Sequence, residues 1–122
     1  MSTTAPTITT VVGDYLAAWN ARDAQTRRGL VQRAFTDGAT YVDPHRFGAG
    51  HEALDAMIAA AQDGLPGHHI EPNGDVDAHN DRVRFSWTLV GPDGPVAIGR
   101  DFAIVGADGR LRDVTGFVDP VA

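Results

Sequence analysis

The sequence predicts an α+β domain in which three N-terminal helices pack on one face of a strongly curved antiparallel sheet. Apolar residues recur at helical spacing in the first half of the chain, and after Gly67 they alternate with polar residues at a period of two. Helices followed by strands are typical of the α+β class. The chain has 122 residues, 43% of them hydrophobic, which is enough for one such domain and too few for two. We expect a flexible N-terminus over residues 1–7 and a single domain over residues 8–120.

The first helix is predicted from Ile8 to about Asn20, because its apolar residues form one stripe at i, i+3, i+4 and i+7: Ile8, Val11, Val12, Tyr15, Leu16 and Trp19. Asp23 is a suitable N-cap for the second helix, and Asp37-Gly38 is expected to end it. The third helix is predicted over residues 52–62, closed by Gly64 and Pro66.

Strands account for most of the rest of the chain. A short strand over residues 39–42 leads into Asp43-Pro44, and the proline biases Asp43 toward extended geometry. Four longer strands are predicted at about 68–78, 82–90, 95–105 and 110–118, separated by turn signals. A strongly curved sheet closed on one side by helices leaves a cone-shaped cavity, and concave apolar sites of this kind bind small ligands.

Composition excludes several function classes. The 16 acidic and 10 basic residues give a net charge of −6, and the basic residues are scattered, so nucleic acid is not an expected partner. The absence of cysteine excludes disulfides, thiolate nucleophiles and zinc–thiolate sites. The five histidines have no pair at helical ligand spacing, so no metal site is predicted. The segment MSTTAPT lacks the features of a signal peptide, and no stretch predicts a membrane span, so we expect a cytoplasmic protein with no membrane partner.

Three polar residues are candidates for a site inside the cavity. Tyr15 lies within the apolar stripe of the first helix, and Asp101 shares a strand face with alanine, glycine and valine residues. Asp43 ends a strand. Each also has a structural explanation. Tyr15 could be a core tyrosine bonded to backbone, Asp101 could form a salt bridge with Arg112 or be exposed on a sheet edge, and Asp43 could be a turn aspartate. Taken singly, the structural explanation is favoured for each.

Taken together, Tyr15, Asp43 and Asp101 favour a catalytic site, because the segments around them resemble a known family. The segments DYLAAWNARDA, ATYVDP with a following G-x-x-A-L helix, and RDFAIVGADGRL resemble the ketosteroid isomerase branch of the nuclear transport factor 2-like (NTF2-like), or SnoaL-like, superfamily. The resemblance extends from Thr9 to Val118. It implies an isomerase without a cofactor, in which Asp43 is the base and Tyr15 with a protonated Asp101 donates hydrogen bonds to an enolate oxygen. It also implies a homodimer and a hydrophobic small-molecule ligand.

We expect the cavity to be lined by seven further residues: Trp19, Val42, His45, Ala103, Val114, Gly116 and Val118. The strand face around Asp101 carries small residues where the isomerases carry bulkier ones, which predicts a wider pocket. Arg46 and His45 follow Asp43 closely, so they could hold its carboxylate as an anion, and His45 is an alternative acid.

Other functions fit the same cavity. A polyketide cyclase would use its carboxylates similarly, and an epoxide hydrolase of this fold would need an Asp-Arg-Asp set built from Asp43, Asp101 and either Arg112 or Arg84. A non-catalytic module that binds a small molecule or simply dimerises is a third possibility, because one fold hosts many functions.

Overall fold

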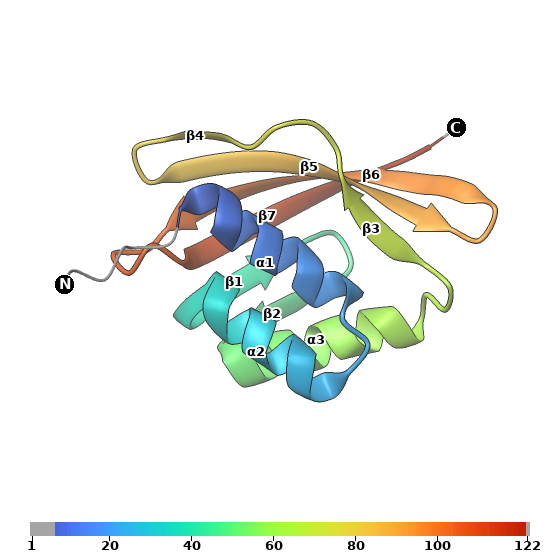
Figure 1. The fold of residues 1–122 in the computed structure, drawn as a ribbon, viewed down its shortest axis with the longest axis horizontal. Coiled ribbons are helices and arrows are strands. Elements are labelled where there is room, and N and C mark those ends of the chain that lie inside the picture. The colour runs from blue at the N-terminus through green and yellow to red at the C-terminus, as the bar shows by residue number, and fades with distance from the viewer. Residues whose placement is uncertain (1–6, 122) are drawn as a thin grey trace.

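The computed structural model describes residues 7–121, which form three helices and seven strands (Figure 1). The predicted flexible N-terminus, residues 1–7, lies outside the described residues except for Thr7. In chain order the elements are α1 (Ile8–Asn20), α2 (Ala24–Ala34), β1 (Phe35–Val42), β2 (Phe47–Ala49), α3 (His51–Asp63), β3 (His69–Pro72), β4 (Asp77–His79), β5 (Arg82–Gly91), β6 (Gly94–Val105) and β7 (Leu111–Pro120).

The helices lie together on one side of the sheet, as predicted (Figure 1). The sheet order is β2-β1-β7-β6-β5-β3, with β4 also paired to β5. The prediction of an entirely antiparallel sheet is wrong, because β1 pairs parallel with β7 and the other pairs are antiparallel. The expected strong curvature is also absent, since β5, β6 and β7 run as long, gently bent ribbons in Figure 1. The fold is therefore α+β with a mixed sheet.

Local sequence explains the helix ends. Thr7 caps α1 by accepting a hydrogen bond from the backbone N–H of Thr10, and Asp23 caps α2 by accepting one from the N–H of Thr26. The helix α2 ends earlier than predicted, at Ala34, because Phe35 is already extended and starts β1.

The Asp37-Gly38 pair does not end a helix. Gly38 has a φ of 73° and lies where the β1–β7 register shifts, so the pair forms an irregularity within the strand.

Two strands also differ from the prediction. The loop after Asp43 contains the short strand β2, and the predicted strand at 68–78 is divided into β3 and β4.

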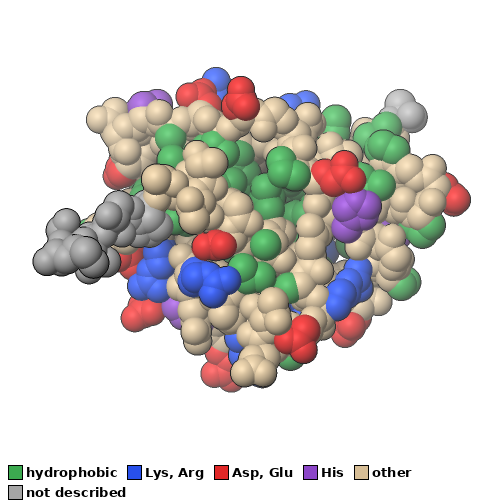
Figure 2. All heavy atoms as spheres, viewed as in Figure 1, with side chains coloured by type: hydrophobic (Ala, Val, Ile, Leu, Met, Phe, Trp, Pro, Cys, Tyr) green, Lys and Arg blue, Asp and Glu red, His purple; other side chains and the backbone are tan. Residues whose placement is uncertain are grey.

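The core lies between the helices and the inner face of the sheet. Its largest fully buried side chains include Tyr15, Tyr41, Phe35, Leu54 and Ile58. Three polar or charged residues are buried with them: Arg27, Gln62 and Asp101. On the surface, acidic and basic side chains are interspersed over the face seen in Figure 2, with no single-sign patch. Within residues 7–121, no helix is long and apolar enough to cross a membrane.

Candidate functional site

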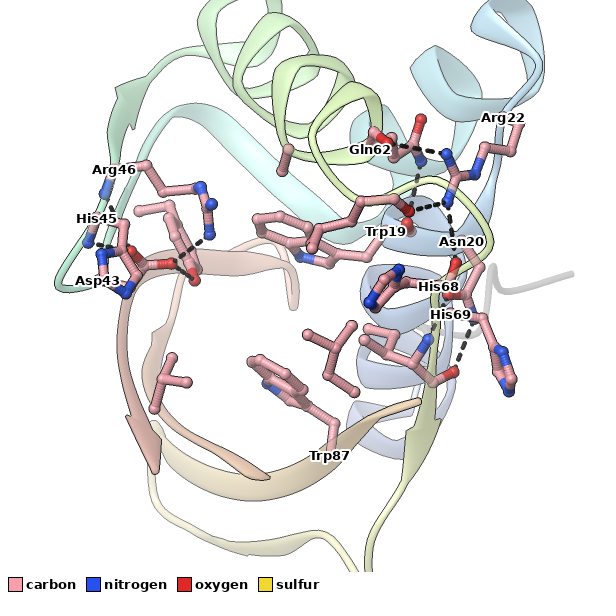
Figure 3. Close-up of a pocket in the computed structure, with 16 residues that line it drawn as sticks. Trp19, Asn20, Arg22, Asp43, His45, Arg46, Gln62, His68, His69 and Trp87 are labelled. Carbon is pink, nitrogen blue, oxygen red and sulfur yellow. Dashed lines mark hydrogen bonds and ion pairs between the residues drawn. The ribbon is translucent and has the colours of Figure 1, made fainter. Parts of the chain in front are cut away.

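A pocket of about 240 Å³ opens between the C-terminal end of α1, the β1–β2 loop, the end of α3 and strands β3, β5 and β7. Figure 3 shows Trp19 and Trp87 on opposite sides of it, with Asp43, His45 and Arg46 at one end. Its lining is mainly apolar, and the polar groups come mostly from loops. Small-ligand sites typically combine an apolar surface with polar groups that orient the ligand, as here.

Some of the residues expected to line this pocket do so, and others do not. Trp19, His45 and Val118 line it, as does Asp43. Four others do not: Ala103 and Val114 are buried in the core, Val42 is 41% exposed, and Gly116 is buried and does not reach the pocket.

Asp43 is both a turn aspartate and a carboxylate that contacts Arg46, which are two of the interpretations that the sequence left open. Its Oδ1 accepts hydrogen bonds from the backbone N–H groups of His45 (2.7 Å) and Arg46 (3.0 Å), as a turn aspartate does. Its Oδ2 accepts from the Tyr41 hydroxyl (2.6 Å) and from Arg46 Nη1 (3.2 Å). The side chain is only 2% exposed, yet it borders the pocket. The turn thus presents a carboxylate to the pocket with four donors around it.

Asp101 is a buried acid, and none of the cationic side chains within residues 7–121 pairs with it. Its Oδ2 accepts hydrogen bonds from the Tyr15 hydroxyl (2.7 Å) and from Trp87 Nε1 (3.1 Å), and its Oδ1 has no partner among the described residues. Burial raises the pKa of Asp101 to about 6, although the two hydrogen bonds act in the opposite direction. The carboxyl is therefore easier to protonate than an exposed aspartate.

The expected salt bridge from Asp101 to Arg112 is not formed. The β6–β7 register shifts between Ile104 and Val105, so the buried residue opposite Val105 is Leu111, and Arg112 is exposed and pairs with Asp113 (3.0 Å). Arg84 pairs with Asp77 (2.8 Å). The Asp-Arg-Asp set proposed with either arginine is thus not assembled.

Two tyrosines complete the buried network. Tyr15 is fully buried behind the pocket wall, and both burial and the negative charge of Asp101 raise its pKa well above the usual value. Tyr41, on β1, also has a raised pKa, caused by burial and by the charges of Asp101 and Asp43. Both hydroxyls therefore remain protonated and act as donors at neutral pH.

The two aspartates meet at Gly116. A β-carbon at this position would lie 2.8 Å from Asp101 Oδ1, 3.1 Å from the Tyr41 hydroxyl and 3.4 Å from the β-carbon of Asp43. The structure thus brings Tyr15, Asp43 and Asp101 into one region, with Tyr15 hydrogen-bonded to Asp101 and with both aspartates beside Gly116.

Tyr41 and Trp87 were not predicted as site residues. Their alternation with neighbouring strand residues indicated an inward-facing side chain, but only the folded sheet shows that they bond to the two aspartates. No group of histidine, aspartate and glutamate side chains within residues 7–121 could hold a metal ion.

No protein-family model and no curated protein matches the chain. Among solved structures, it is similar to a candidate isomerase of the SnoaL-like family from Agrobacterium tumefaciens, with 42% identity, a TM-score of 0.86, and coverage of 91% of this chain and 96% of that one.

Two more distant structures share the fold. A candidate polyketide cyclase from Sinorhizobium meliloti is 18% identical with a TM-score of 0.69, over 88% of this chain and 93% of that one. An NTF2-like protein of unknown function from Exiguobacterium is 21% identical with a TM-score of 0.71, over 89% and 98%. The 42% identity over nearly the whole of both chains leads to one conclusion: the chain belongs to the SnoaL-like family, and its fold is NTF2-like.

Proposed function

We propose that this protein is a cofactor-free isomerase that moves a proton between carbon atoms of a small hydrophobic ketone. The observation that carries the proposal is the pair of aspartates at Gly116, which have opposite surroundings. Asp43 accepts four hydrogen bonds, one of them from a guanidinium. Asp101 is buried, has no cationic partner among the described residues, and has a pKa that burial raises to about 6. Two acids with different environments can divide the roles of base and acid. The similarity to a candidate isomerase supports this choice.

Asp43 is the proposed base. A carboxylate has about four lone-pair sites, and all four are engaged here, so one donor must leave before a proton can be accepted. Arg46 Nη1 has the longest of the four contacts, at 3.2 Å, and the Arg46 side chain is 31% exposed. We therefore assign Arg46 as the donor that a substrate displaces from Oδ2.

Asp101 is the proposed hydrogen-bond donor to the enolate. Neither Gly116 nor Asp101 lines the pocket, so we propose that a bound substrate extends the pocket toward Gly116, where the missing side chain leaves Asp101 Oδ1 as the nearest group. When protonated, Oδ1 would donate to the substrate oxygen, and Tyr15 and Trp87 would hold the other oxygen in place. Tyr15 then positions Asp101 and does not touch the substrate, which differs from the role implied by the family resemblance.

The reaction balances without a cofactor. Asp43 removes a proton from the carbon next to the carbonyl, and the electron pair moves to the carbonyl oxygen to give an enolate that accepts a hydrogen bond from Asp101. Asp43 then returns the same proton to a different carbon, so a β,γ-unsaturated ketone becomes conjugated.

The test is the conversion of 3-cyclohexenone to 2-cyclohexenone, followed by ultraviolet absorbance. The wild type should catalyse the reaction, and Asp43→Asn should lower kcat by about 10²- to 10⁴-fold, the usual contribution of a general base. The control is Asp37→Asn, at a side chain that is 92% exposed, which should keep full activity. Absence of turnover in the wild type, or equal turnover in Asp43→Asn, would overturn the proposal. Ring closure of a linear polyketone in place of isomerisation would identify a cyclase instead.

We also propose that the protein is a homodimer formed through the outer face of the sheet. Three exposed phenylalanines, Phe47 (66%), Phe102 (44%) and Phe117 (60%), lie on that face of β2, β6 and β7. Val42 is paired with Phe47 and with Thr115, and Thr115 is paired with Phe102, so these side chains form a row across the strands. An exposed apolar row of this kind is typical of a protein interface.

A further inference from the structure

Trp87 is held against the sheet by a glycine on the neighbouring strand. Gly99 is its direct cross-strand partner, and a β-carbon on Gly99 would lie 2.0 Å from two carbons of the Trp87 ring. Real β-carbons do not come so close to other atoms, so the indole occupies the space that any other residue at position 99 would fill. Gly99 is required for this position of the ring.

A hydrogen bond fixes the ring further. Trp87 Nε1 donates to Asp101 Oδ2 at 3.1 Å, so the indole cannot rotate without losing that bond. The ring therefore has one side on Gly99 and its polar edge on Asp101. The remaining surface lines the pocket (Figure 3).

Trp19 closes the pocket from the opposite side (Figure 3). Its ring centroid lies 5.4 Å from that of Tyr41, and the Arg46 guanidinium lies over it at 5.9 Å. These contacts limit its movement as well. Both tryptophans of the chain thus face the same pocket, one from α1 and one from β5.

The size of the pocket limits what can lie between the two rings. Its volume of about 240 Å³ is below the usual range for drug-sized ligands, about 300–1,000 Å³. This volume is suited to a compound of one or two rings, and a four-ring compound would extend beyond it. Aromatic faces prefer to stack on other flat π-systems.

We propose that the substrate is a flat ketone of one or two rings that stacks on Trp87, and that Gly99 determines this specificity. That the ligand is a substrate and a ketone rests on the function proposed above. The preference for a flat ring rests on the placement of Trp87 alone.

The experiment measures Kd by isothermal titration calorimetry for two ketones of similar size. 2-Tetralone has an aromatic ring, and 2-decalone is its saturated, puckered counterpart. The wild type should bind 2-tetralone about 2- to 10-fold more tightly, which corresponds to the usual contribution of an aromatic pair. A four-ring ketosteroid should bind at least 10-fold more weakly than 2-tetralone.

Three variants test whether Gly99 and Trp87 cause the preference for 2-tetralone over 2-decalone. Gly99→Ala displaces the indole and should abolish the preference, and Trp87→Leu should abolish it by removing the aromatic face. Trp87→Phe should keep it, because a flat ring remains. The control is Gly13→Ala, where an added β-carbon meets nothing within 4 Å. Thermal unfolding of each variant verifies that it is folded, and a preference lost in Trp87→Leu alone suffices if Gly99→Ala does not fold.

Equal binding of the two ketones by the wild type would overturn the inference, as would a preference that persists in Trp87→Leu or tight binding of the four-ring ketone. These results are separable from those of the activity test. A ring preference without isomerisation would contradict the proposed reaction and leave the stacking site standing. Isomerisation without a ring preference would contradict only the substrate class.

Discussion

Replacing Asp101 by asparagine should change how stability depends on pH. Burial raises the pKa of Asp101 from 3.8 to about 6 in the folded protein, so the folded state binds this proton more tightly than the unfolded state does. The stabilisation from the bound proton is fully present below pH 3.8 and is lost as pH rises to about 6. The difference of about 2.2 pKa units, at 1.36 kcal/mol per unit, corresponds to about 3 kcal/mol.

Asparagine at this position cannot ionise, and its side-chain oxygen can still accept hydrogen bonds from Tyr15 and Trp87. The free energy of unfolding of Asp101→Asn, minus that of the wild type, should therefore increase by about 3 kcal/mol between pH 3.5 and pH 7 and then stay constant. Other titrating groups are common to both proteins and largely cancel in this difference.

Urea unfolding at a series of pH values measures this difference. With a slope of roughly 1–3 kcal/mol/M, the relative midpoint should shift by about 1–3 M across the pH range. Asp37→Asn, at an exposed carboxylate, is the matched control and should show little relative shift. A difference between Asp101→Asn and wild type that is flat with pH, or that decreases as pH rises, would refute the argument from burial.

Two further predictions concern stability and assembly. Arg27→Ala should lower the free energy of unfolding by about 3 kcal/mol, because Arg27 is 7% exposed and its loss leaves Asp55, now 2.8 Å from Arg27 Nε, without a partner. Urea unfolding would measure the loss, and a change below about 1 kcal/mol would contradict it. Phe117→Asp should convert a dimer to a monomer in sedimentation velocity, since it places a charge in the proposed apolar interface. A wild type that sediments as a monomer at micromolar concentration would count against the dimer.

Local sequence was sufficient to predict the three helices and the long strands. The apolar stripe of α1 and the cap at Asp23 act over a few residues, so their effect can be read without knowing the fold. The end of α2 was misjudged because Phe35 is held by pairing with Leu111, which lies far away along the chain. The parallel pairing of β1 with β7 and the short strand β2 likewise depend on contacts that no local pattern contains.

In the candidate site, too, some features could be predicted from the sequence and others depend on contacts between distant residues. The sequence, by itself and by resemblance, determined that Tyr15, Asp43 and Asp101 are candidates and that the face around Asp101 carries small residues. Only the tertiary structure decided what each group bonds to. A register shift between β6 and β7 leaves Arg112 exposed and paired with Asp113, so it does not pair with Asp101. The absence of a side chain at Gly99 leaves room for the ring of Trp87 beside Asp101. The physical reason is that hydrogen bonding and burial depend on cross-strand neighbours, and one residue of register reverses which side chains face the pocket.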